Sequence, residues 1–407
     1  MFKRESEKSS FYQEIAQILP FLPRHFAKQK QTLDAAFDGY RLHQTLSPSA
    51  LDLILMSYRY AHWFERVVKT FSSKKIKPAE MLDLWLLGFT ALLTRENPPA
   101  FAIVSECVSL AKARYGAHTG GITNAFLRHI ERELAKLREE LRASPQIALP
   151  EWLRERWAGA MDLDRVAQNF VKRPERGVGG FGENLEYVRR EWSPEIFRAQ
   201  FQAMDPGSFD FCRWVSERLG TQDKNFFDAC AAPGGKAIYM ANHLSRSVGL
   251  GDVVLCESKS ARMNPLKENW RRWELPETSS LFALHEWGAE VPPKAITARS
   301  WHFALVDLPC SGSGTLYTRP DVLYREWPAD IASLEKIQSS ILRDIRELKV
   351  PKLFVSICSV DPVEIANVSR ALGAEPSFRS WESVNDDDGA REGIVGWYCG
   401  PALRPLQ

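Results

Sequence analysis

Two cysteines follow stretches of chain that have the composition of buried β-strands. Cys310 comes after the apolar residues 303–306, Cys358 comes after the mostly apolar residues 353–357, and small residues follow each cysteine. Such runs predict strands that end in tight loops. Ligands of open α/β sheets bind at the carboxyl edge, where we therefore expect both thiols. Two thiols beside a ligand-binding cleft indicate covalent catalysis.

Most buried cysteines are small apolar residues of a core, and a thiol that keeps its proton, with a usual pKa of about 8.5, is a poor nucleophile. Four cysteines fit the core description: Cys107, Cys212, Cys256 and Cys399. Cys310 and Cys358 differ because each lies in a loop of small residues, and because Asp307 shares the first loop. Their separation of 48 positions (358 minus 310) leaves room for one crossover helix. Neighbouring strands would then bring the thiols to one cleft.

A glycine turn follows another predicted strand, which begins near Asn225. The turn reads Cys230-Ala231-Ala232-Pro233-Gly234-Gly235-Lys236 and precedes a predicted helix. Neither glycine carries a Cβ atom, so a ligand can approach the backbone closely. The turn has neither the Gly-x-Gly-x-x-Gly dinucleotide pattern nor the full spacing of a P-loop. By itself it distinguishes poorly between a cofactor site and a structural turn, since many α/β loops are rich in glycine.

Glu257 strengthens the interpretation as a cofactor site. It ends the next predicted strand, 21 positions beyond Lys236 (257 minus 236). An acid at this place is the usual ribose anchor of Rossmann-type sheets, because its carboxylate accepts hydrogen bonds from the ribose hydroxyls. The turn and the acid together favour a nucleoside cofactor.

The composition of the 407-residue chain limits its class. Its 53 basic and 51 acidic residues give a formal net charge of +2, so any basic surface must be local. The seven cysteines show no Cys-x-x-Cys spacing, which argues against a disulfide scaffold and a zinc site. Residues 1–10 are charged and polar, and no apolar run approaches the roughly 18 residues of a membrane span. We expect a cytoplasmic protein without a metal or a membrane segment.

Hydrophobic periodicity divides the chain into three parts. Residues 1–143 carry apolar residues at spacings of three and four, which predicts an all-helical domain. Residues 144–218 are interrupted by proline and glycine and predict a connector with a small subdomain. Residues 219–407 alternate predicted strands and helices, so we expect a mostly parallel, doubly wound α/β sheet. Strands are expected at 253–256, 303–306 and 353–357, and helices at 258–273 and 331–348.

The connector mixes basic and aromatic residues in a pattern suited to phosphates and stacked bases. The basic residues are Lys172, Arg173, Arg176, Arg189 and Arg190, and the aromatic residues are Phe170, Phe181, Tyr187 and Trp192. An ordinary solvated linker explains the same residues equally well. The pattern therefore leaves contact with RNA open.

The motifs resemble, in their order along the chain, those of RNA cytosine-C5 methyltransferases. They are the turn at 230–236, the segment 257–273 with Arg262 and Glu268-Asn269, the loop 307–310 followed by Arg319-Pro320-Asp321, and the strand end at Cys358. The chain is similar to the bacterial 16S rRNA branch of that family, the Sun/Fmu, RsmB-like group. Upstream, residues 120–128 and 150–153 resemble the end of that group's NusB-like RNA-binding domain. The resemblance implies a Rossmann-like methyltransferase domain preceded by an all-α NusB-like domain.

This resemblance implies a covalent mechanism with S-adenosylmethionine as methyl donor. Cytosine C5 is too electron-poor to take a methyl group directly, so the thiolate of Cys358 would add to C6 and make C5 nucleophilic. After methyl transfer a base removes the C5 proton and the thiol is eliminated, a release in which Cys310 is the implied helper. Asp307 would lie between cofactor and cytosine, and Lys236 would stabilise charge on the ring. The target must leave any stack, which favours a single-stranded or flipped cytosine.

The resemblance also implies a cofactor site. Its residues are Cys230, Ala231, Ala232, Pro233, Gly234, Gly235, Lys236, Glu257, Arg262 and Asp307. An aspartate usually ends the third strand in the family, whereas this chain reads Leu284-His285-Glu286-Trp287, in which Glu286 is the expected substitute. Residues 207–214 depart from the family's Gln-Asp motif, and residues 395–400 depart from its Asp-Gly-Phe-Phe motif.

Two other functions compete with a monomeric methyltransferase that acts on 16S rRNA. An RNA-binding or ribosome-assembly protein that keeps the fold without turnover would explain the altered motifs, but it would not need both thiols. A nucleotide-dependent oxidoreductase would share the sheet and Glu257, but it would not need the loop from Asp307 to Cys310.

Overall fold

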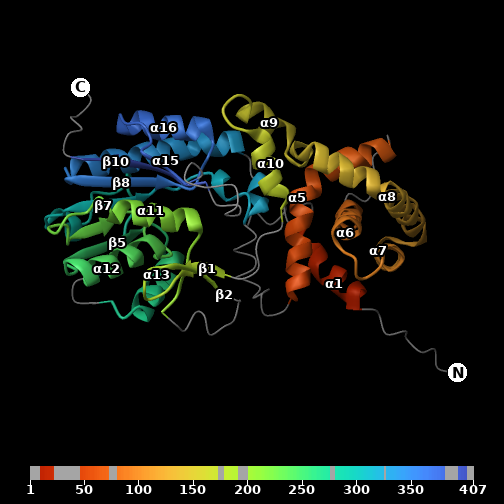
Figure 1. The fold of residues 1–407 in the computed structure, drawn as a ribbon, viewed down its shortest axis with the longest axis horizontal. Helices are drawn as coiled ribbons and strands as arrows, with labels where there is room; N and C mark the ends of the chain where they lie inside the picture. The colour runs from red at the N-terminus through yellow and green to blue at the C-terminus, as the bar shows by residue number, and fades with distance from the viewer. Residues whose placement is uncertain are drawn as a thin grey trace. The chain divides into compact units, whose positions relative to one another are not determined.

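The chain forms two compact units in the computed structural model (Figure 1). The first comprises Met1–Arg173 and Leu316–Arg325, and the second comprises Pro174–Thr315 and Glu326–Gln407. The structure describes residues 10–22, 46–72, 80–172, 178–190, 200–275, 280–324, 327–380 and 393–400. Of the predicted connector, residues 144–173 pack with the first unit and residues 174–218 with the second. The division into three functional parts remains a prediction.

Helices build the described part of the first unit, as the apolar periodicity predicts. They are α1 (Ser10–Ile18), η1 (Leu19–Phe21), α5 (Pro48–Phe71), α6 (Met81–Thr94), α7 (Ala100–Tyr115), α8 (Ala117–Ala143), η3 (Pro145–Ala148), α9 (Glu151–Trp157), α10 (Leu163–Val171) and η6 (Pro320–Tyr324). Ser47 caps α5 by accepting a hydrogen bond from the Ala50 amide at 3.1 Å, and Pro48 begins the helix. α6 is buried around most of its circumference and forms the centre of this core.

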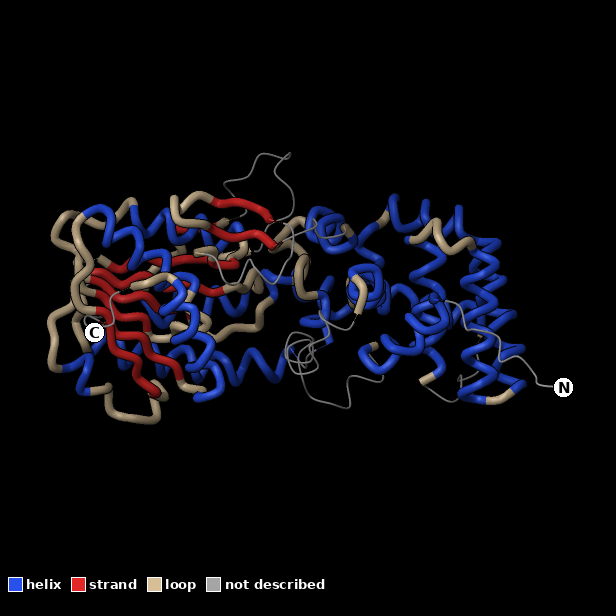
Figure 2. The backbone as a smooth tube through the Cα atoms, turned by 90° about the horizontal axis from the view of Figure 1, so that it is seen from below, coloured by secondary structure: helices blue, strands red, loops and turns tan. Residues whose placement is uncertain are grey.

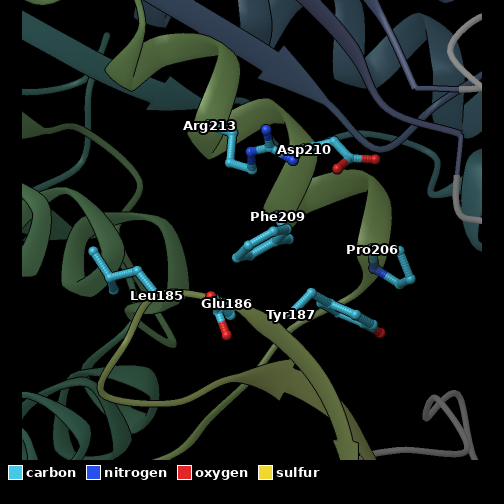
Figure 3. Close-up of a pocket in the computed structure, with 7 residues that line it drawn as sticks. All are labelled: Leu185, Glu186, Tyr187, Pro206, Phe209, Asp210 and Arg213. Atoms are coloured by element: carbon cyan, nitrogen blue, oxygen red, sulfur yellow. The ribbon is translucent and has the colours of Figure 1, made fainter.

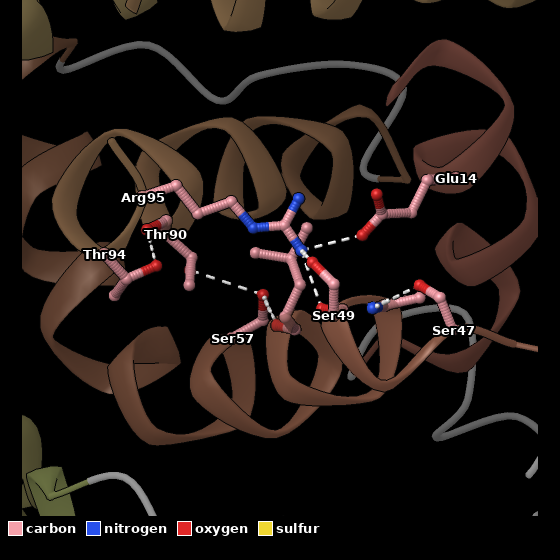
Figure 4. Close-up of polar contacts among 9 residues, drawn as sticks. Glu14, Ser47, Ser49, Ser57, Thr90, Thr94 and Arg95 are labelled. Atoms are coloured by element: carbon pink, nitrogen blue, oxygen red, sulfur yellow. Dashed lines mark hydrogen bonds and ion pairs between the residues drawn. The ribbon is translucent and has the colours of Figure 1, made fainter. Parts of the chain in front are cut away.

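Arg95, at the end of α6, joins three helices of the first unit (Figure 4). Its guanidinium donates to Glu14 Oε1 in α1 at 2.7 Å and to the Ser49 carbonyl in α5 at 2.6 Å. The Ser57 hydroxyl adds a contact between α5 and α6, donating to Thr90 Oγ1 at 3.3 Å. These polar contacts fix the helices against one another where apolar packing alone would allow sliding.

The segment Leu316–Arg325 is far in sequence from the helices with which it packs. Within it, the Tyr324 hydroxyl donates to the Tyr58 carbonyl at 3.2 Å, and its ring stacks on His62 with centroids 4.9 Å apart. The buried guanidinium of Arg59 donates to the Tyr317 carbonyl. The chain therefore passes directly from the loop after Cys310 into a segment that the helical unit holds.

The second unit contains one small and one large sheet. The small antiparallel sheet has the order β2-β1-β3 and consists of β1 (Val178–Phe181), β2 (Tyr187–Arg190) and β3 (Gln202–Ala203). The large sheet has the order β6-β5-β4-β7-β8-β10-β9. Its strands are β4 (Phe226–Asp228), β5 (Val253–Glu257), β6 (Ser280–Leu284), β7 (Phe303–Asp307), β8 (Lys352–Ile357), β9 (Phe378–Arg379) and β10 (Val395–Cys399). Strands β4 to β8 are parallel, which confirms the predicted architecture.

Helices cover both faces of the large sheet (Figures 1 and 2). They are α11 (Pro206–Ser216), α12 (Gly235–Ser247), α13 (Ser260–Arg272), α14 (Lys294–Thr297), α15 (Trp327–Glu347) and α16 (Pro362–Leu372), with the short turn η5 (Ser313–Thr315). Successive strand residues enter opposite cores: Phe226 packs with the core that includes α12 and α13, and Phe227 with the core that includes α15 and α16. The strands are consequently apolar on both faces, as a covered parallel sheet requires.

The strand order reverses at β4, which lies between β5 and β7. Open α/β sheets bind ligands in the crevice at such a switch point, beyond the carboxyl ends of the strands. β10, the segment that departs from the family's last motif, is an ordinary buried strand paired antiparallel with β8. Within the described ranges, no helix combines the length and the apolar character needed to cross a membrane.

Candidate active site

The two cysteines expected to be reactive meet at the carboxyl edge of the large sheet. β7 and β8 are neighbouring parallel strands, with Asp307 opposite Ser356, and Cys310 and Cys358 lie in the loops that follow them. The two Sγ atoms are 2.9 Å apart, and both side chains are half-buried. One crossover, through α15, connects the strands. The expectation that the 48-residue spacing would bring the thiols to one cleft agrees with this geometry.

The thiols of Cys310 and Cys358 form a hydrogen bond in which either sulfur can be the donor. This hydrogen bond, together with burial, raises the pKa of the Cys310 thiol well above its usual range. Cys310 therefore keeps its proton near neutral pH and can donate it to the Cys358 sulfur. A hydrogen bond of this kind favours the thiolate, which is the form of a cysteine that attacks carbon.

Asp307 stands beside the thiols in a polar triad. Its Oδ2 atom accepts from Lys236 Nζ at 2.7 Å, and its Oδ1 atom accepts from the Ser356 hydroxyl at 2.6 Å. Burial disfavours the ammonium of Lys236, but the charge and hydrogen bond of Asp307 outweigh it and raise the pKa of Lys236. The Asp307 side chain keeps 33% of its surface exposed, so it remains open to a ligand while its orientation is fixed.

The turn after β4 has the backbone geometry that its glycines allow. Gly234 adopts a left-handed φ of +109°, and a Cβ atom there would lie 2.9 Å from Leu266 Cδ1. Gly235 begins α12, and the Ala231 amide ties the turn to β5 by donating to the Cys256 carbonyl at 2.9 Å. The turn therefore delivers the chain from the sheet edge to the start of α12, and a helix N-terminus is a place where backbone amides can bind an anionic group.

Two side chains of α13 hold this turn from outside. Arg262 donates to the Ala232 carbonyl at 2.5 Å, and Asn269 donates to the Pro233 carbonyl at 2.8 Å. The role expected for Arg262 as a direct cofactor ligand stays a prediction, because in this structure its guanidinium contacts the turn and Glu257.

Glu257 ends β5 and is 3% exposed. Its Oε1 atom accepts from the Lys259 amide at 3.0 Å, and its Oε2 atom lies 3.3 Å from Arg262 Nη1. The Arg262 side chain is 52% exposed, so an incoming hydroxyl can replace it at little cost. The geometry fits an acid that exchanges an exposed ion pair for hydrogen bonds to a ribose.

Glu286 lies two residues beyond the end of β6 and is exposed. Its backbone amide donates to Glu290 Oε2 at 3.2 Å. Its neighbours His285 and Trp287 are buried, and the Trp287 indole donates to the Ala229 carbonyl at 2.9 Å. Glu286 presents an exposed carboxylate near the strand end, as does Glu290 of the same loop, and the place of Glu286 beside a cofactor remains a prediction.

Asp228, at the end of β4, was missed by reasoning from the sequence. Its carboxyl is buried and accepts a hydrogen bond from the Cys230 amide at 3.1 Å. Burial raises the pKa of Asp228 to about 7, and the nearby charge of Asp307 acts in the same direction. Burial likewise raises the pKa of the Cys230 thiol well above its usual range, so Cys230 is a neutral lining residue. The signal for Asp228 was an acid directly before the glycine turn.

The described basic and aromatic residues of the connector are divided between the two units. Phe170 is buried in the first unit and Phe181 is buried in the second, so neither ring is exposed for stacking on a base, and contact with RNA elsewhere in the connector stays open. Both rings complete apolar cores instead. Arg190 lies over the Phe201 ring at 5.1 Å. Arg173, Arg176 and Trp192 lie outside the described residues.

Part of this region lines a hollow of about 310 Å³ between the β1–β2 hairpin and α11 (Figure 3). Tyr187 and Phe209 supply its aromatic faces, with ring centroids 5.5 Å apart. Asp210 and Arg213 lie one turn apart on α11 at its border. Its mixed charge does not single out a phosphate.

Buried polar residues behind the thiols were also missed. They are Ser311, Ser313, Gln338, Ser356, Ser359 and Glu364. In the sequence they look like ordinary polar residues of loops and helices, and only their burial sets them apart. Among the described residues, no cluster of three or more histidine, cysteine, aspartate and glutamate side chains is placed to hold a metal ion.

The chain is similar to known methyltransferases. Residues 219–394 match the family described as 16S rRNA methyltransferase RsmB/F. A protein of Synechocystis sp. described as probable ribosomal RNA small subunit methyltransferase B is 24% identical, covering 88% of each chain. A protein of Bacillus subtilis with the same description is 26% identical, covering 77% of this chain and 76% of its own. The crystal structure of a protein designated PH0851 has the same fold, with a TM-score of 0.67 at 15% identity over 96% of this chain and 99% of its own.

Proposed function

We propose that this chain, whose residues 219–394 match the RsmB/F family of methyltransferases, transfers a methyl group to C5 of a cytosine in RNA. The observation that carries the proposal is the thiol pair, with Sγ atoms 2.9 Å apart beside Asp307. A methyltransferase that acts on a more reactive atom would need no thiol, whereas C5 of cytosine needs a nucleophile to activate it. The RNA-binding scaffold would not need both thiols, and the oxidoreductase would not need the loop from Asp307 to Cys310.

Cys358 is the nucleophile in this proposal. Its sulfur bonds to C6, and the electron pair of the C5=C6 bond moves onto C5. Cys310 donates the hydrogen bond that favours the attacking thiolate, since it keeps its own proton. Of the two half-buried thiols, the one that accepts this hydrogen bond is the better nucleophile.

Asp307 and Lys236 orient the cytosine and balance its charge. The Asp307 carboxylate is anchored on both sides, by Lys236 and by Ser356, yet a third of its side chain is exposed. It can accept a hydrogen bond from the exocyclic amine of the base. The ammonium of Lys236 then lies close enough to offset negative charge on the ring.

S-adenosylmethionine supplies the methyl group that C5 takes up. Gly234 gives the turn its left-handed φ of +109°, and its lack of a Cβ atom makes room for the core residue Leu266, whose Cδ1 atom would lie 2.9 Å away. Glu257 would hold the ribose and Asp307 the polar end of the cofactor, while Glu286 is proposed on the adenine side. Residues 230–236 would line the site between them.

Release reverses the first bond. The C5–H bond breaks, its proton passes to a base or to water, and its electron pair restores the C5=C6 bond. The C6–S bond breaks, and its pair returns to the sulfur of Cys358. Cys310 assists by donating a hydrogen bond to the leaving sulfur, from the position it occupies in the free pair.

The substrate we propose is 16S rRNA, because the family's description names it. The target cytosine has to leave its stack to reach a thiol that is half-buried. We further propose that the protein works in the cytoplasm as a monomer and that its NusB-like helical unit binds RNA.

Total RNA from a strain that lacks the gene is the substrate for the test. The protein and radiolabelled S-adenosylmethionine are added, and the labelled position is mapped by bisulfite sequencing. We expect label at C5 of a cytosine in 16S rRNA, and no label in RNA from the parent strain, which is already methylated. Absence of label together with absence of cofactor binding in calorimetry would support the RNA-binding scaffold instead.

A further inference from the structure

Glu364 carries a fully buried carboxylate directly behind the thiol pair. It lies in the first turn of α16, and its exposed fraction is 0%. The Ser311 hydroxyl donates to its Oε2 atom at 2.7 Å, and the Ser311 amide donates to Oε1 at 3.1 Å and to Oε2 at 3.3 Å. Gln338, from α15, donates to Oε1 at 2.9 Å. All of these donors belong to, or hold, the loop that carries Cys310.

The contacts fix the backbone on both sides of Cys310. Gln338 Nε2 also donates to the Pro309 carbonyl at 2.8 Å. The peptide group before Cys310 is thus held by Gln338, and the one after it by Glu364. Because both of its flanks are restrained, the Cys310 side chain has little freedom to leave the pair.

The same network reaches the loop of Cys358. The Ser311 hydroxyl lies 3.2 Å from the Ser359 hydroxyl, and Ser359 lies 2.8 Å from the Ser313 hydroxyl. The Gly314 amide donates to the Cys358 carbonyl at 3.0 Å. The two loops are therefore joined through buried hydroxyls, with the carboxylate of Glu364 at the far end.

Burying a carboxylate without a cation is costly, and it persists only where hydrogen bonds compensate. In the described part of the chain, no lysine, arginine or histidine forms an ion pair with Glu364. The start of α16 supplies part of the compensation, since Asp361 caps the helix and its first turn favours negative charge. The compensating donors come from Ser311 and Gln338, which hold the loop of Cys310, and this points to a role beyond packing.

We propose that Glu364 is a positioning residue which, through Ser311 and Gln338, holds Cys310 Sγ against Cys358 Sγ for the release step. The inference rests on the proposed function and adds to it a residue that touches neither RNA nor cofactor. When this hold is lost, addition of Cys358 to C6 becomes slower but still occurs, whereas release slows more because the leaving sulfur no longer meets its hydrogen-bond donor. The covalent protein–RNA complex then accumulates.

Glu364→Gln tests this positioning role. The glutamine side chain has the size of glutamate, but its NH₂ group would face the hydrogen-bond donors of Ser311 and Gln338. Ser311→Ala is the second variant, which removes only a hydroxyl and keeps the fold testable should Glu364→Gln be unstable. Asp223→Asn is the matched control: Asp223 is buried before β4, at the opposite edge of the sheet, and pairs with Lys352 at 2.6 Å. RNA, cofactor and each variant are mixed, and adduct per methyl group transferred is measured on denaturing gels.

We expect adduct release to slow about 100-fold in Glu364→Gln, the order expected for a displacement of about 1 Å, and less in Ser311→Ala. Asp223→Asn should release the covalent adduct at the wild-type rate, even if the substitution lowers the melting temperature of the protein. The positioning role would be overturned if Glu364→Gln slowed formation and release of the covalent adduct by the same factor. It would also be overturned if Glu364→Gln released the adduct as fast as Asp223→Asn does.

A second measurement needs no RNA. The rate of alkylation of Cys310, followed against pH by mass spectrometry, reports whether its thiol is still held by Cys358. We expect the profile of Glu364→Gln to move toward lower pH and that of Asp223→Asn to stay in place. If wild-type protein methylates nothing but this shift occurs, the proposed function fails and the hold on Cys310 stands. If methylation occurs without the shift, the inference fails alone.

Discussion

The carboxyl edge of the large sheet has two halves that are built by different means. In the thiol half, buried side chains of α15 and α16, such as Gln338 and Glu364, form hydrogen bonds with the loop after β7, and buried hydroxyls connect this loop to the loop after β8. In the cofactor half, the turn after β4 is shaped by a left-handed glycine and held by side chains of α13 that donate to its carbonyls.

The difference follows from what each half has to do. The thiol half must keep two sulfur atoms in contact through bond formation and release, so its polar contacts are buried and shielded from water. The cofactor half must admit and discharge a ligand at every turnover. Its ion pair between Glu257 and Arg262 is therefore partly exposed and replaceable.

Replacing Cys358 should have the largest effect, because it removes the bond-forming atom of the thiol half. We expect Cys358→Ala to lower methyl transfer by several orders of magnitude, as loss of a nucleophile does. Binding of S-adenosylmethionine should stay unchanged, since the cofactor half is intact. Cys399→Ala is the control, because Cys399 lies in β10. Methylation by Cys358→Ala at the wild-type rate would remove the covalent mechanism.

Replacing Cys310 should separate the two steps of the thiol half. Cys310→Ala leaves the nucleophile in place but removes the donor to the leaving sulfur. We expect a stable covalent complex with RNA that survives denaturing electrophoresis, with turnover reduced by about 100-fold or more. A variant that turns over normally and forms no complex would assign release to another group.

The parts of this edge that follow from local pattern could be predicted. Apolar runs that end in small residues located β7 and β8, and the single crossover between them made the convergence of Cys310 and Cys358 predictable. The strand β7 proved one residue longer than expected, at Asp307, because this acid still pairs with Ser356 of the neighbouring strand. The composition of a segment indicates that it forms a strand. The residue at which the strand ends depends on how far the neighbouring strand extends beside it.

The supports of the thiols could not be predicted. Glu364 follows Asp361-Pro362, which marks the start of a helix but does not say that its first turn faces the core. Gln338 lies in the middle of α15, where one polar residue looks like another until the packing of the helix is known. Phe170 and Phe181 depend on tertiary packing in the same way. In the sequence they fit base stacking, but in the structure each is buried in a different unit.

Replacing Glu257 should weaken the cofactor half without disturbing the thiols. Loss of charged hydrogen bonds to a ribose corresponds to about 1.5–3 kcal/mol, or about a 10- to 150-fold higher Kd for S-adenosylmethionine. Calorimetry on Glu257→Ala measures it. Arg262→Ala should change the Kd by about fivefold at most, because its ion pair with Glu257 is partly exposed. An unchanged Kd in Glu257→Ala would place the ribose elsewhere.

The smallest effect is expected at the junction of the halves, where Asp228 ends β4 near Asp307. Its pKa is raised from 3.8 to about 7, so the folded protein binds a proton that the unfolded chain has already lost. The stability linked to this proton is fully present below about pH 4 and is lost as the pH rises through about 7.

Asp228→Asn cannot lose that proton, and its amide oxygen can still accept from the Cys230 amide. The wild type should therefore lose about 1 kcal/mol of stability relative to Asp228→Asn between about pH 6 and pH 8. Denaturant midpoints followed by circular dichroism measure the difference. Parallel curves for the two proteins would mean that Asp228 does not change its protonation between pH 6 and pH 8, and would overturn the raised pKa.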